Sequence, residues 1–229
     1  MRRFTAFFLC FCFLWVPVRA AAQEKLVALT FDDGPSGRFT RRLLEGLAQR
    51  DVRATFFLCG YRLEQYPRLA ESIAAAGHEL GVHGFSHQSM CTMTAGELTQ
   101  EIRSTLSLLP SANIAFLRPP GGMCSQRLQT VAEKFDLTIL QWSVDPQDWA
   151  IDNAAQIAQR VIQKAGDGDV ILLHDMSDSS VDAALMIVDA LLAKGFCFVT
   201  ASELAQAKGR ALIPGKVYAR FRRDGQDEK

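Results

Sequence analysis

Two adjacent carboxylates and a pair of imidazoles are the residues of this sequence best suited to chemistry. Asp32 and Asp33 follow the apolar run 26–31 and precede a Gly-Pro turn, and His83 and His87 follow a second apolar run. One carboxylate and two imidazoles form a zinc ligand set that keeps one coordination position open for water. The sequence therefore predicts a divalent metal held by Asp33, His83 and His87, with Asp32 free to act as a base.

Each of these motifs also has a purely structural interpretation. Two aspartates before Gly-Pro often form no more than a turn. Histidines four residues apart share a face only on a helix. Here they follow a strand-like run, so a loop must fold His87 back toward His83. His78 begins a strand-like run rather than ending one, and we expect it to be structural.

Polar residues also follow the fourth, fifth and sixth strand-like runs. Arg118 follows the fourth run, Asp148 follows the fifth, and His174 ends the sixth. The carboxyl ends of parallel strands lie on one face of α/β sheets and barrels. We therefore expect these residues to join the metal ligands in one active site. Taken singly, they also fit a rigid turn, a helix start and a structural histidine.

These residue types suit metal-assisted hydrolysis of an amide or an ester. A bound divalent ion lowers the pKa of a water molecule toward about 7 and polarises a carbonyl group. Asp32 would take the proton of that water, and Arg118 would keep Asp32 ionised through a bidentate pair. The backbone N–H groups at Gly121 and Gly122 are accessible and suit the role of oxyanion donors.

The later strand ends supply an acid and an apolar wall. His174 would protonate the leaving nitrogen, and Asp148 would orient His174 and raise its pKa. Trp149 and Leu172 would form an apolar wall that fits a small acyl methyl group. With these residues the predicted site contains a metal, a base, an acid and an acyl pocket.

Strand-like and helical patterns alternate along the chain. The strand-like runs are 26–31, 54–58, 79–82, 115–117, 138–142, 170–173 and 196–199. The helical patterns are 40–49, 66–76, 94–109, 125–135, 153–165, 181–194 and 201–208. This alternation predicts an α/β protein with a parallel sheet or barrel.

Length and composition indicate one exported domain. The chain has 229 residues, of which 48% are hydrophobic. Residues 1–22 have the basic start, apolar stretch and small-residue end of a secretory signal peptide, although an uncleaved anchor has a similar pattern. We expect a catalytic domain over 23–210, a charged tail over 211–229 that is loose from residue 216, and a secreted or cell-envelope location. After signal cleavage we expect no stable membrane span.

Charge argues against nucleic acid as a partner. The leader carries three arginines and no acidic residue, so cleavage leaves 22 basic and 25 acidic residues. Nucleic-acid binding requires a basic face. Among the four remaining cysteines, Cys59 and Cys197 lie in apolar runs and are expected to be buried thiols. Cys91 and Cys124 lie in loops beside the predicted site, so a disulfide between them is plausible in an exported protein.

The ordered motifs resemble those of the polysaccharide deacetylases of the NodB-homology group, carbohydrate esterase family 4. The resemblance runs from about residue 25 to 208, with motifs at 30–35, 83–87, 118–122, 145–149 and 173–175. It implies a distorted (β/α) barrel with about seven parallel strands. It also implies Asp32 as the base, His174 as the acid and the three metal ligands named above.

Two positions depart from the family pattern. Gly84 stands where serine or threonine is usual, which removes a hydrogen bond that helps to set the histidine loop. Gly121 stands where an aromatic residue is common, which removes one wall of the sugar site but keeps the backbone donor. Neither change affects a metal ligand or a proton carrier, so activity is expected.

The resemblance implies a monomeric, secreted enzyme that removes N-acetyl groups from a glycan. Peptidoglycan is the first expected substrate, and chitin-type polymers of N-acetylglucosamine are the second. The expected metal is Zn²⁺, with Co²⁺ or another divalent ion as an alternative. An O-acetyl esterase acting on xylan is the nearest alternative activity. A catalytically silent glycan-binding protein is the alternative of another class.

Overall fold

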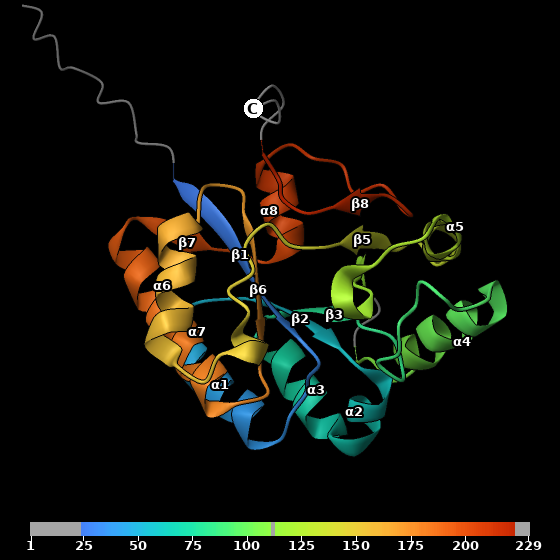
Figure 1. Ribbon diagram of the computed structural model, residues 1–229, viewed down its shortest axis with the longest axis horizontal. Coiled ribbons are helices and arrows are strands. Elements are labelled where there is room, and N and C mark those ends of the chain that lie inside the picture. The colour runs from blue at the N-terminus through green and yellow to red at the C-terminus, as the bar shows by residue number, and fades with distance from the viewer. Residues whose placement is uncertain (1–23, 111–112, 223–229) are drawn as a thin grey trace, which may run out of the picture.

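The computed structural model describes residues 24–110 and 113–222, which form an α/β fold (Figure 1). The strands are β1 (Lys25–Asp32), β2 (Thr55–Leu58), β3 (Glu79–Val82), β4 (Phe116–Leu117), β5 (Thr138–Leu140), β6 (Val170–His174), β7 (Phe196–Phe198) and β8 (Val217–Tyr218). The helices are α1 (Arg38–Ala48), α2 (Gly60–Gln65), α3 (Pro67–Ala75), α4 (Ala95–Leu106), α5 (Gln126–Lys134), α6 (Ala154–Lys164), α7 (Asp178–Ala193) and α8 (Ala201–Ala207). Two short 3₁₀ turns, η1 (Pro120–Gly122) and η2 (Asp148–Ala150), lie near the predicted site.

The strands form a distorted parallel barrel. Their order is β6-β1-β2-β3-β4-β5-β8, with β7 paired to the first half of β1, and every pairing between these strands is parallel. The ring closes through a single parallel bridge between Val144 and Ile171, on the segment that follows β5. Within the described residues, only this bridge, and no continuous ladder, joins the segment after β5 to β6. The predicted barrel architecture is confirmed.

Buried side chains that alternate along the strands belong to two separate hydrophobic clusters. On β1, Val27, Leu29 and Phe31 belong to the larger cluster, which packs against the outer helices, while Ala28 belongs to a smaller one. Side chains of a strand alternate between faces, so the two clusters lie on opposite faces of the sheet. The smaller cluster includes Phe57, and Gly81 on the adjacent strand makes room for it, since a Cβ there would lie 2.7 Å from the ring.

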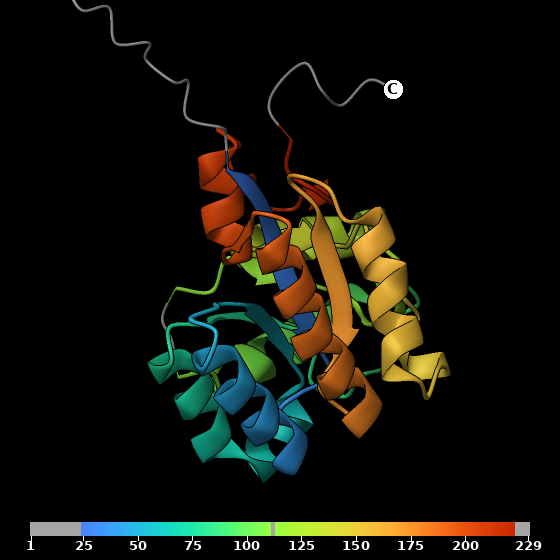
Figure 2. The same ribbon diagram turned by 90° about the vertical axis from the view of Figure 1, so that its left-hand side faces the viewer.

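The seven predicted strands are all present, within three residues at each end. Each of the seven predicted helices is also present, and a capping box begins α4, in which the Thr94 hydroxyl and the Glu97 carboxylate bond each other's backbone N–H. Helix α2, which has six residues, was not predicted from the sequence. Figure 2 shows α1, α6 and α7 on the outside of the barrel, flanking β6 and β1.

The prediction that the charged tail is loose from residue 216 is wrong as far as residue 222. Val217–Tyr218 forms β8 beside β5, which makes an eighth strand. Phe221 is fully buried in the smaller core together with residues of α8, and its N–H donates to Gly168 O at 2.8 Å. A large aromatic side chain buries enough apolar surface to hold an otherwise charged segment in place. The domain therefore extends beyond its predicted end at residue 210.

We expected an N-terminal signal peptide and no membrane span after its cleavage. Residues 1–22, the predicted signal peptide, lie outside the described residues. Within the described part of the chain, no helix combines the length and the apolar character that a membrane crossing requires.

Candidate active site

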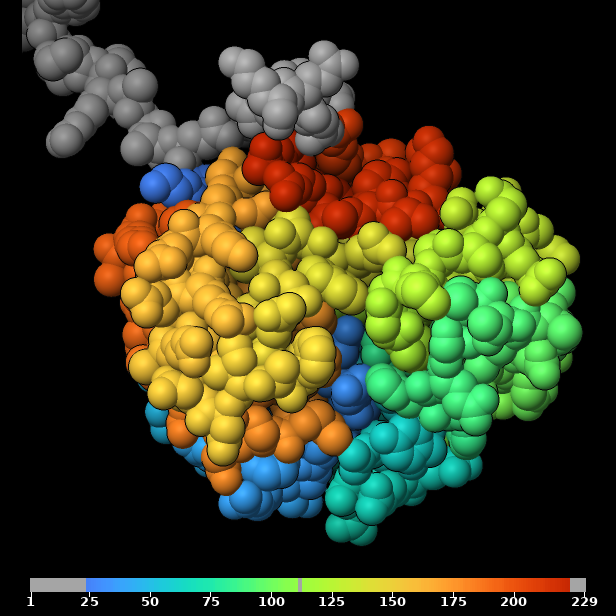
Figure 3. Space-filling model, viewed as in Figure 1, coloured from blue at the N-terminus to red at the C-terminus, as the bar shows by residue number. Residues whose placement is uncertain are grey.

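The predicted site residues meet at the carboxyl ends of the strands. The parallel register of β1 and β6 places Asp32 directly beside His174, and His83 and Arg118 follow the paired ends of β3 and β4. Figure 3 shows a hollow at this face, where blue atoms from the end of β1 lie recessed between yellow and green segments. The hollow includes a cavity of about 360 Å³, lined by Asp32, Asp33, His83, His87, Gly121, Trp142, Asp145, Trp149, Leu172 and His174.

Asp33, His83 and His87 form a candidate metal-binding group. Their candidate ligand atoms all lie within 4.8 Å of one another. Asp33 Oδ1 is 3.2 Å from His83 Nε2 and 2.8 Å from His87 Nε2. Burial raises the pKa of Asp33, but the two facing imidazoles more than offset this and hold the pKa below its usual range. The carboxylate is therefore ionised at neutral pH, as a metal ligand must be.

The hydrogen bonding of His83 tests whether these residues fit a metal. His83 Nδ1 lies 2.8 Å from the carbonyl oxygen of Arg118. A carbonyl can only accept, so Nδ1 donates to it, and in the neutral tautomer that this bond selects, Nε2 is the atom that can bind a cation. The facing Oδ1 of Asp33 is buried and has no hydrogen bond of good geometry. Two electron-rich atoms in this arrangement fit a site that a cation completes.

The loop between the two histidines is held by a residue that the sequence did not indicate. Glu101, on α4, accepts hydrogen bonds through Oε2 from the backbone N–H groups of Phe85 at 2.6 Å and Ser86 at 2.9 Å. Gly84 has φ of 77°, and a Cβ there would lie 3.1 Å from Glu101 Oε2. Glu101 thus supplies the stiffness expected to be lost at Gly84, and it turns His87 back toward His83.

Arg118 is fully buried and holds Asp32, the predicted base. Its Nη1 donates to Asp32 Oδ1 at 2.7 Å and to Thr30 Oγ1 at 2.8 Å. Its Nε and Nη2 donate to the carbonyl oxygens of Leu140 and Gln141. The predicted contact between Arg118 and Asp32 is confirmed, but it is not bidentate because these backbone carbonyls take the other guanidinium donors. Oδ2 of Asp32 is therefore left free of Arg118.

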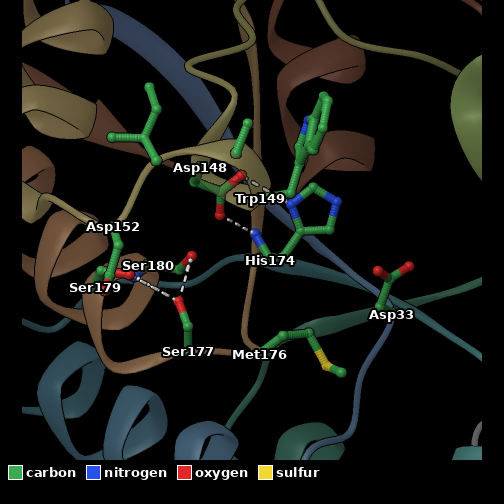
Figure 4. A pocket seen from close by; sticks show the side chains of 11 residues that line it. Asp33, Asp148, Trp149, Asp152, His174, Met176, Ser177, Ser179 and Ser180 are labelled. Atoms are coloured by element: carbon green, nitrogen blue, oxygen red, sulfur yellow. Dashed lines mark hydrogen bonds and ion pairs between the residues drawn. The ribbon is translucent and has the colours of Figure 1, made fainter.

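His174 and Asp148 form a second buried pair (Figure 4). Asp148 Oδ1 is 2.8 Å from His174 Nδ1, and Oδ2 accepts the His174 backbone N–H at 2.8 Å. Burial lowers the pKa of His174, but the Asp148 carboxylate more than offsets this and raises it to about 9. His174 is therefore protonated at neutral pH, and because Nδ1 is occupied, Nε2 is the atom that can donate to a substrate.

The two glycines after Arg118 do not share one role. Gly121 lines the cavity and has open space where a Cβ would be. The Gly122 N–H donates to Pro119 O at 2.9 Å, and a Cβ on Gly122 would lie 2.7 Å from the Trp142 ring. The prediction of Gly122 as an oxyanion donor is therefore wrong, because its only donor closes the turn. Gly121 stays a predicted donor.

The predicted disulfide between Cys91 and Cys124 is absent from the structure, in which both are free thiols. Cys91 Sγ lies 3.4 Å from Ser89 Oγ in its own loop. Cys124 instead packs against the larger core, and burial raises the pKa of its thiol. The two side chains turn to different environments, so the loops are not linked.

Two further residues of the cavity were also missed. Trp142 forms part of its wall, and Asp145 accepts the Gln147 N–H at 2.7 Å, which shapes the turn that carries Asp148. Asp145 stands in the motif 145–149 but was given no role. For Glu101, at the middle of a helical pattern, the sequence holds no signal. The structure confirms the structural role of His78, whose buried ring accepts the Ala54 N–H through Nδ1 at 3.1 Å.

Comparison with known proteins identifies the family. The sequence profile described as "Polysaccharide deacetylase" matches residues 19–140. The chain belongs to the polysaccharide deacetylase family. One member of this family, the peptidoglycan-N-acetylglucosamine deacetylase of Bacillus cereus, is 36% identical over 85% of this chain and 75% of its own length.

Two further members extend the comparison. The peptidoglycan-N-acetylmuramic acid deacetylase PdaC of Bacillus subtilis is 34% identical over 81% of this chain and 40% of its own length, so the chain spans about two fifths of that relative. The structure of a family 4 acetyl xylan esterase from Clostridium thermocellum in complex with a cobalt ion is 32% identical. It superposes with a TM-score of 0.80 over 86% of this chain and 98% of the esterase. The chain thus shares its fold with this esterase.

Proposed function

We propose that this protein is a metal-dependent hydrolase that removes N-acetyl groups from a glycan. One observation carries the proposal: the Asp33, His83 and His87 group shares a cavity with an Asp32 held by Arg118 and a His174 paired with Asp148. A buried carboxylate and a protonated imidazole beside a metal group provide a base and an acid for one reaction.

The chemistry follows from the free atoms of these residues. A divalent ion, when bound, would acidify a water molecule and polarise the acetyl carbonyl. Asp32 accepts the proton of the attacking water at Oδ2, since Oδ1 already accepts from Arg118. The Gly121 N–H donates to the oxygen on which negative charge develops. His174 then donates the proton on Nε2 to the leaving nitrogen as the C–N bond breaks, which gives acetate and an amine.

The expected cofactor is one divalent ion, with Zn²⁺ as the first candidate. Two imidazole nitrogens and one carboxylate oxygen suit Zn²⁺ and also other first-row divalent ions. The cobalt ion in the related acetyl xylan esterase supports Co²⁺ as an alternative. A metal titration of purified protein, followed by elemental analysis, identifies the preferred ion.

The proposed substrate is peptidoglycan, with chitin-type N-acetylglucosamine polymers second. The printed names of the Bacillus relatives support the first choice. O-deacetylation of xylan is a second candidate function, supported by the related esterase, because both reactions use the same water, base and acid. We further propose that the protein acts as a monomer in the cell envelope or outside the cell, consistent with the predicted leader.

Acetate release from three substrates tests this proposal. The assay uses peptidoglycan, N-acetylglucosamine oligomers and acetylxylan, each with enzyme as purified, after chelation and after Zn²⁺ is restored. We expect acetate from at least one N-acetylated glycan, loss after chelation and recovery with metal. Release from acetylxylan alone would indicate the esterase. Binding of a glycan without acetate release in the presence of metal would indicate the silent binding protein.

A further inference from the structure

The turn that carries the predicted oxyanion donor contains two adjacent glycines. In η1, Gly121 has φ of 68° and ψ of 5°, and Gly122 has φ of 75°. Glycine has no side chain to restrict its dihedral angles, so this backbone has little restraint of its own. Apart from the chain neighbours of Gly121, no heavy atom of the described residues lies within 4 Å of the position that a Cβ there would take. The direction of the Gly121 N–H must therefore be fixed by other contacts of the turn.

Gln141 supplies such a contact from the neighbouring strand end. Its Nε2 lies 2.6 Å from the carbonyl oxygen of Gly122. A carbonyl oxygen can only accept, so the amide nitrogen of Gln141 faces it and donates. Gln141 directly follows β5, and Gly122 ends the turn that follows β4, the strand paired with β5. The hydrogen bond therefore joins the carboxyl ends of two adjacent strands.

The backbone of Gln141 is itself held on both sides. Its N–H donates to Tyr218 O on β8 at 2.7 Å, and its C=O accepts from Arg118 Nη2 at 2.9 Å. Arg118 also donates to Asp32 Oδ1 at 2.7 Å. The side chain of Gln141 thus starts from a fixed point, and it holds the turn in a defined position relative to the predicted base.

The other contacts of Gly122 leave the direction of its carbonyl group open. Its N–H donates to Pro119 O at 2.9 Å, but this bond lies within the turn and moves with it. The Trp142 ring packs against Gly122, since a Cβ there would lie 2.7 Å from the ring. This apolar contact limits the approach of the turn without orienting a carbonyl. The hydrogen bond from Gln141 is the contact that orients it.

We propose that Gln141 is a positioning residue, which holds the two-glycine turn in the conformation in which the Gly121 N–H donates to the developing oxyanion. Gln141 does not line the catalytic cavity, so it acts through the turn rather than on the substrate. The inference rests on the proposed function and deepens it, because it explains how the oxyanion donor is kept in place. An oxyanion donor acts where charge develops, so disorder of the turn raises the energy of the transition state and leaves substrate binding unchanged.

Kinetics with two substrates test this role. Gln141→Met keeps the length of the side chain and removes the donor. We expect kcat to fall about 3–10-fold, the worth of one neutral hydrogen bond. The fall should be equal on a tetramer of N-acetylglucosamine and on p-nitrophenyl acetate, because both reactions pass through an oxyanion. The KM for the tetramer and the affinity for Zn²⁺ should not change.

A tetrahedral analogue separates positioning from a simple loss of folded enzyme. The probe is glucosamine with a methylphosphonyl group on its nitrogen, in which tetrahedral phosphorus replaces the acetyl carbon. Gln141→Met should raise its inhibition constant about 3–10-fold, in parallel with the fall in kcat/KM. If the substitution only inactivates a fraction of the enzyme, kcat falls while the inhibition constant stays the same, and that result would overturn the proposal.

A matched control is available four residues after the turn. Gln126 is an exposed glutamine at the start of α5. Gln126→Met should leave both substrates, the analogue and the affinity for Zn²⁺ unaffected. A loss that Gln141→Met shows on the amide alone would refute the proposal, because it would indicate an effect on the acid. A raised KM or weaker binding of Zn²⁺ would refute it as well.

A measurement of backbone order separates this inference from the proposed function. Protein labelled with ¹⁵N-glycine gives NMR order parameters for Gly121 and Gly122 without any reaction. We expect values of about 0.85 in the wild type and in Gln126→Met, and a fall toward about 0.6 in Gln141→Met. Unchanged order parameters in Gln141→Met would refute the role of Gln141 while acetate release, and with it the proposed function, stands. A fall in order in a protein that releases no acetate would confirm the contact and count against the proposed function.

Discussion

Asp148→Asn should leave His174 largely unprotonated at pH 8, so that it can no longer donate a proton to the leaving group at this pH. In the structure the Asp148 carboxylate offsets burial and raises the pKa of His174 from 6.5 to about 9. This difference corresponds to about 3 kcal/mol of preference for the protonated ring. Asparagine has nearly the same side-chain size as aspartate and keeps one hydrogen-bond acceptor, but it carries no negative charge. A cation held by Asp33 would cancel the minor contributions of Asp32 and Asp33, whereas the direct bond to Asp148 persists.

The size of the effect follows from the fraction of protonated His174. With a pKa of about 9 the ring is about nine-tenths protonated at pH 8. Without the Asp148 charge, burial keeps the pKa of His174 below its usual 6.5, so at most about 3% of the ring is protonated at pH 8. We therefore expect Asp148→Asn to lose at least about 30-fold in the rate of amide hydrolysis at pH 8 and to lose less at pH 6. The measurement is kcat for a chitin-type oligomer across this pH range.

An activated ester supplies the control on the same variant. The p-nitrophenolate leaving group needs no proton, so the pH-dependent loss should disappear with p-nitrophenyl acetate. Stability gives an independent readout. Because the folded-state pKa of His174 is raised, the pair stabilises the wild type fully below pH 6.5, and this contribution is lost as pH rises to about 9. A loss of activity that is the same at every pH, or equal on both substrates, would refute the reasoning.

Changes at four other positions test the metal site and the fold. His83→Ala should abolish tight metal binding, whereas Asp32→Asn should keep the metal and lose about 10²–10⁴ in rate, which elemental analysis beside acetate release will separate. Equally metal-poor variants would contradict the role given to Asp32. Glu101→Ala should weaken metal affinity about 10–100-fold by freeing the histidine loop, and Glu101→Gln, which keeps an acceptor, should largely restore it in a chelator competition. Phe221→Ala should lower the free energy of unfolding by about 3–5 kcal/mol, and a denaturant midpoint equal to that of the wild type would show that the segment after residue 210 is not part of the core.

Local patterns in the sequence were sufficient to predict most of the helices and strands and the principal site residues. The alternation of apolar runs with helical patterns predicted a parallel barrel, since only parallel strands need such long crossovers. A parallel barrel in turn gathers strand ends on one face, so Asp32, Asp33, His83 and His174 were expected together before any distance was available. Tertiary structure confirmed this group and the pairing of Asp148 with His174.

Four expectations failed, three of them because the outcome depended on contacts between distant segments. Arg118 donates to a backbone carbonyl of the next strand, so its pair with Asp32 is not bidentate. The Gly122 N–H donates within its own turn. Cys124 packed into the core rather than toward Cys91. The charged tail was fixed by one buried aromatic, Phe221. Apart from Pro119, which accepts the Gly122 N–H within one turn, these partners lie far away in sequence, so no local pattern could reveal them.

The sequence alone determined which residues can do chemistry and which element ends carry them, because residue type and periodicity are local properties. Tertiary structure decided how each group is held. Glu101 lies 14 residues after His87 along the chain, yet it fixes the loop of both histidines through two backbone bonds. A second cavity, which lies beside Trp149, exists only because η2 and the start of α7 pack side by side. Hydrogen bonds and cavities of this kind depend on the relative positions of several elements, and these positions are set only when the chain folds.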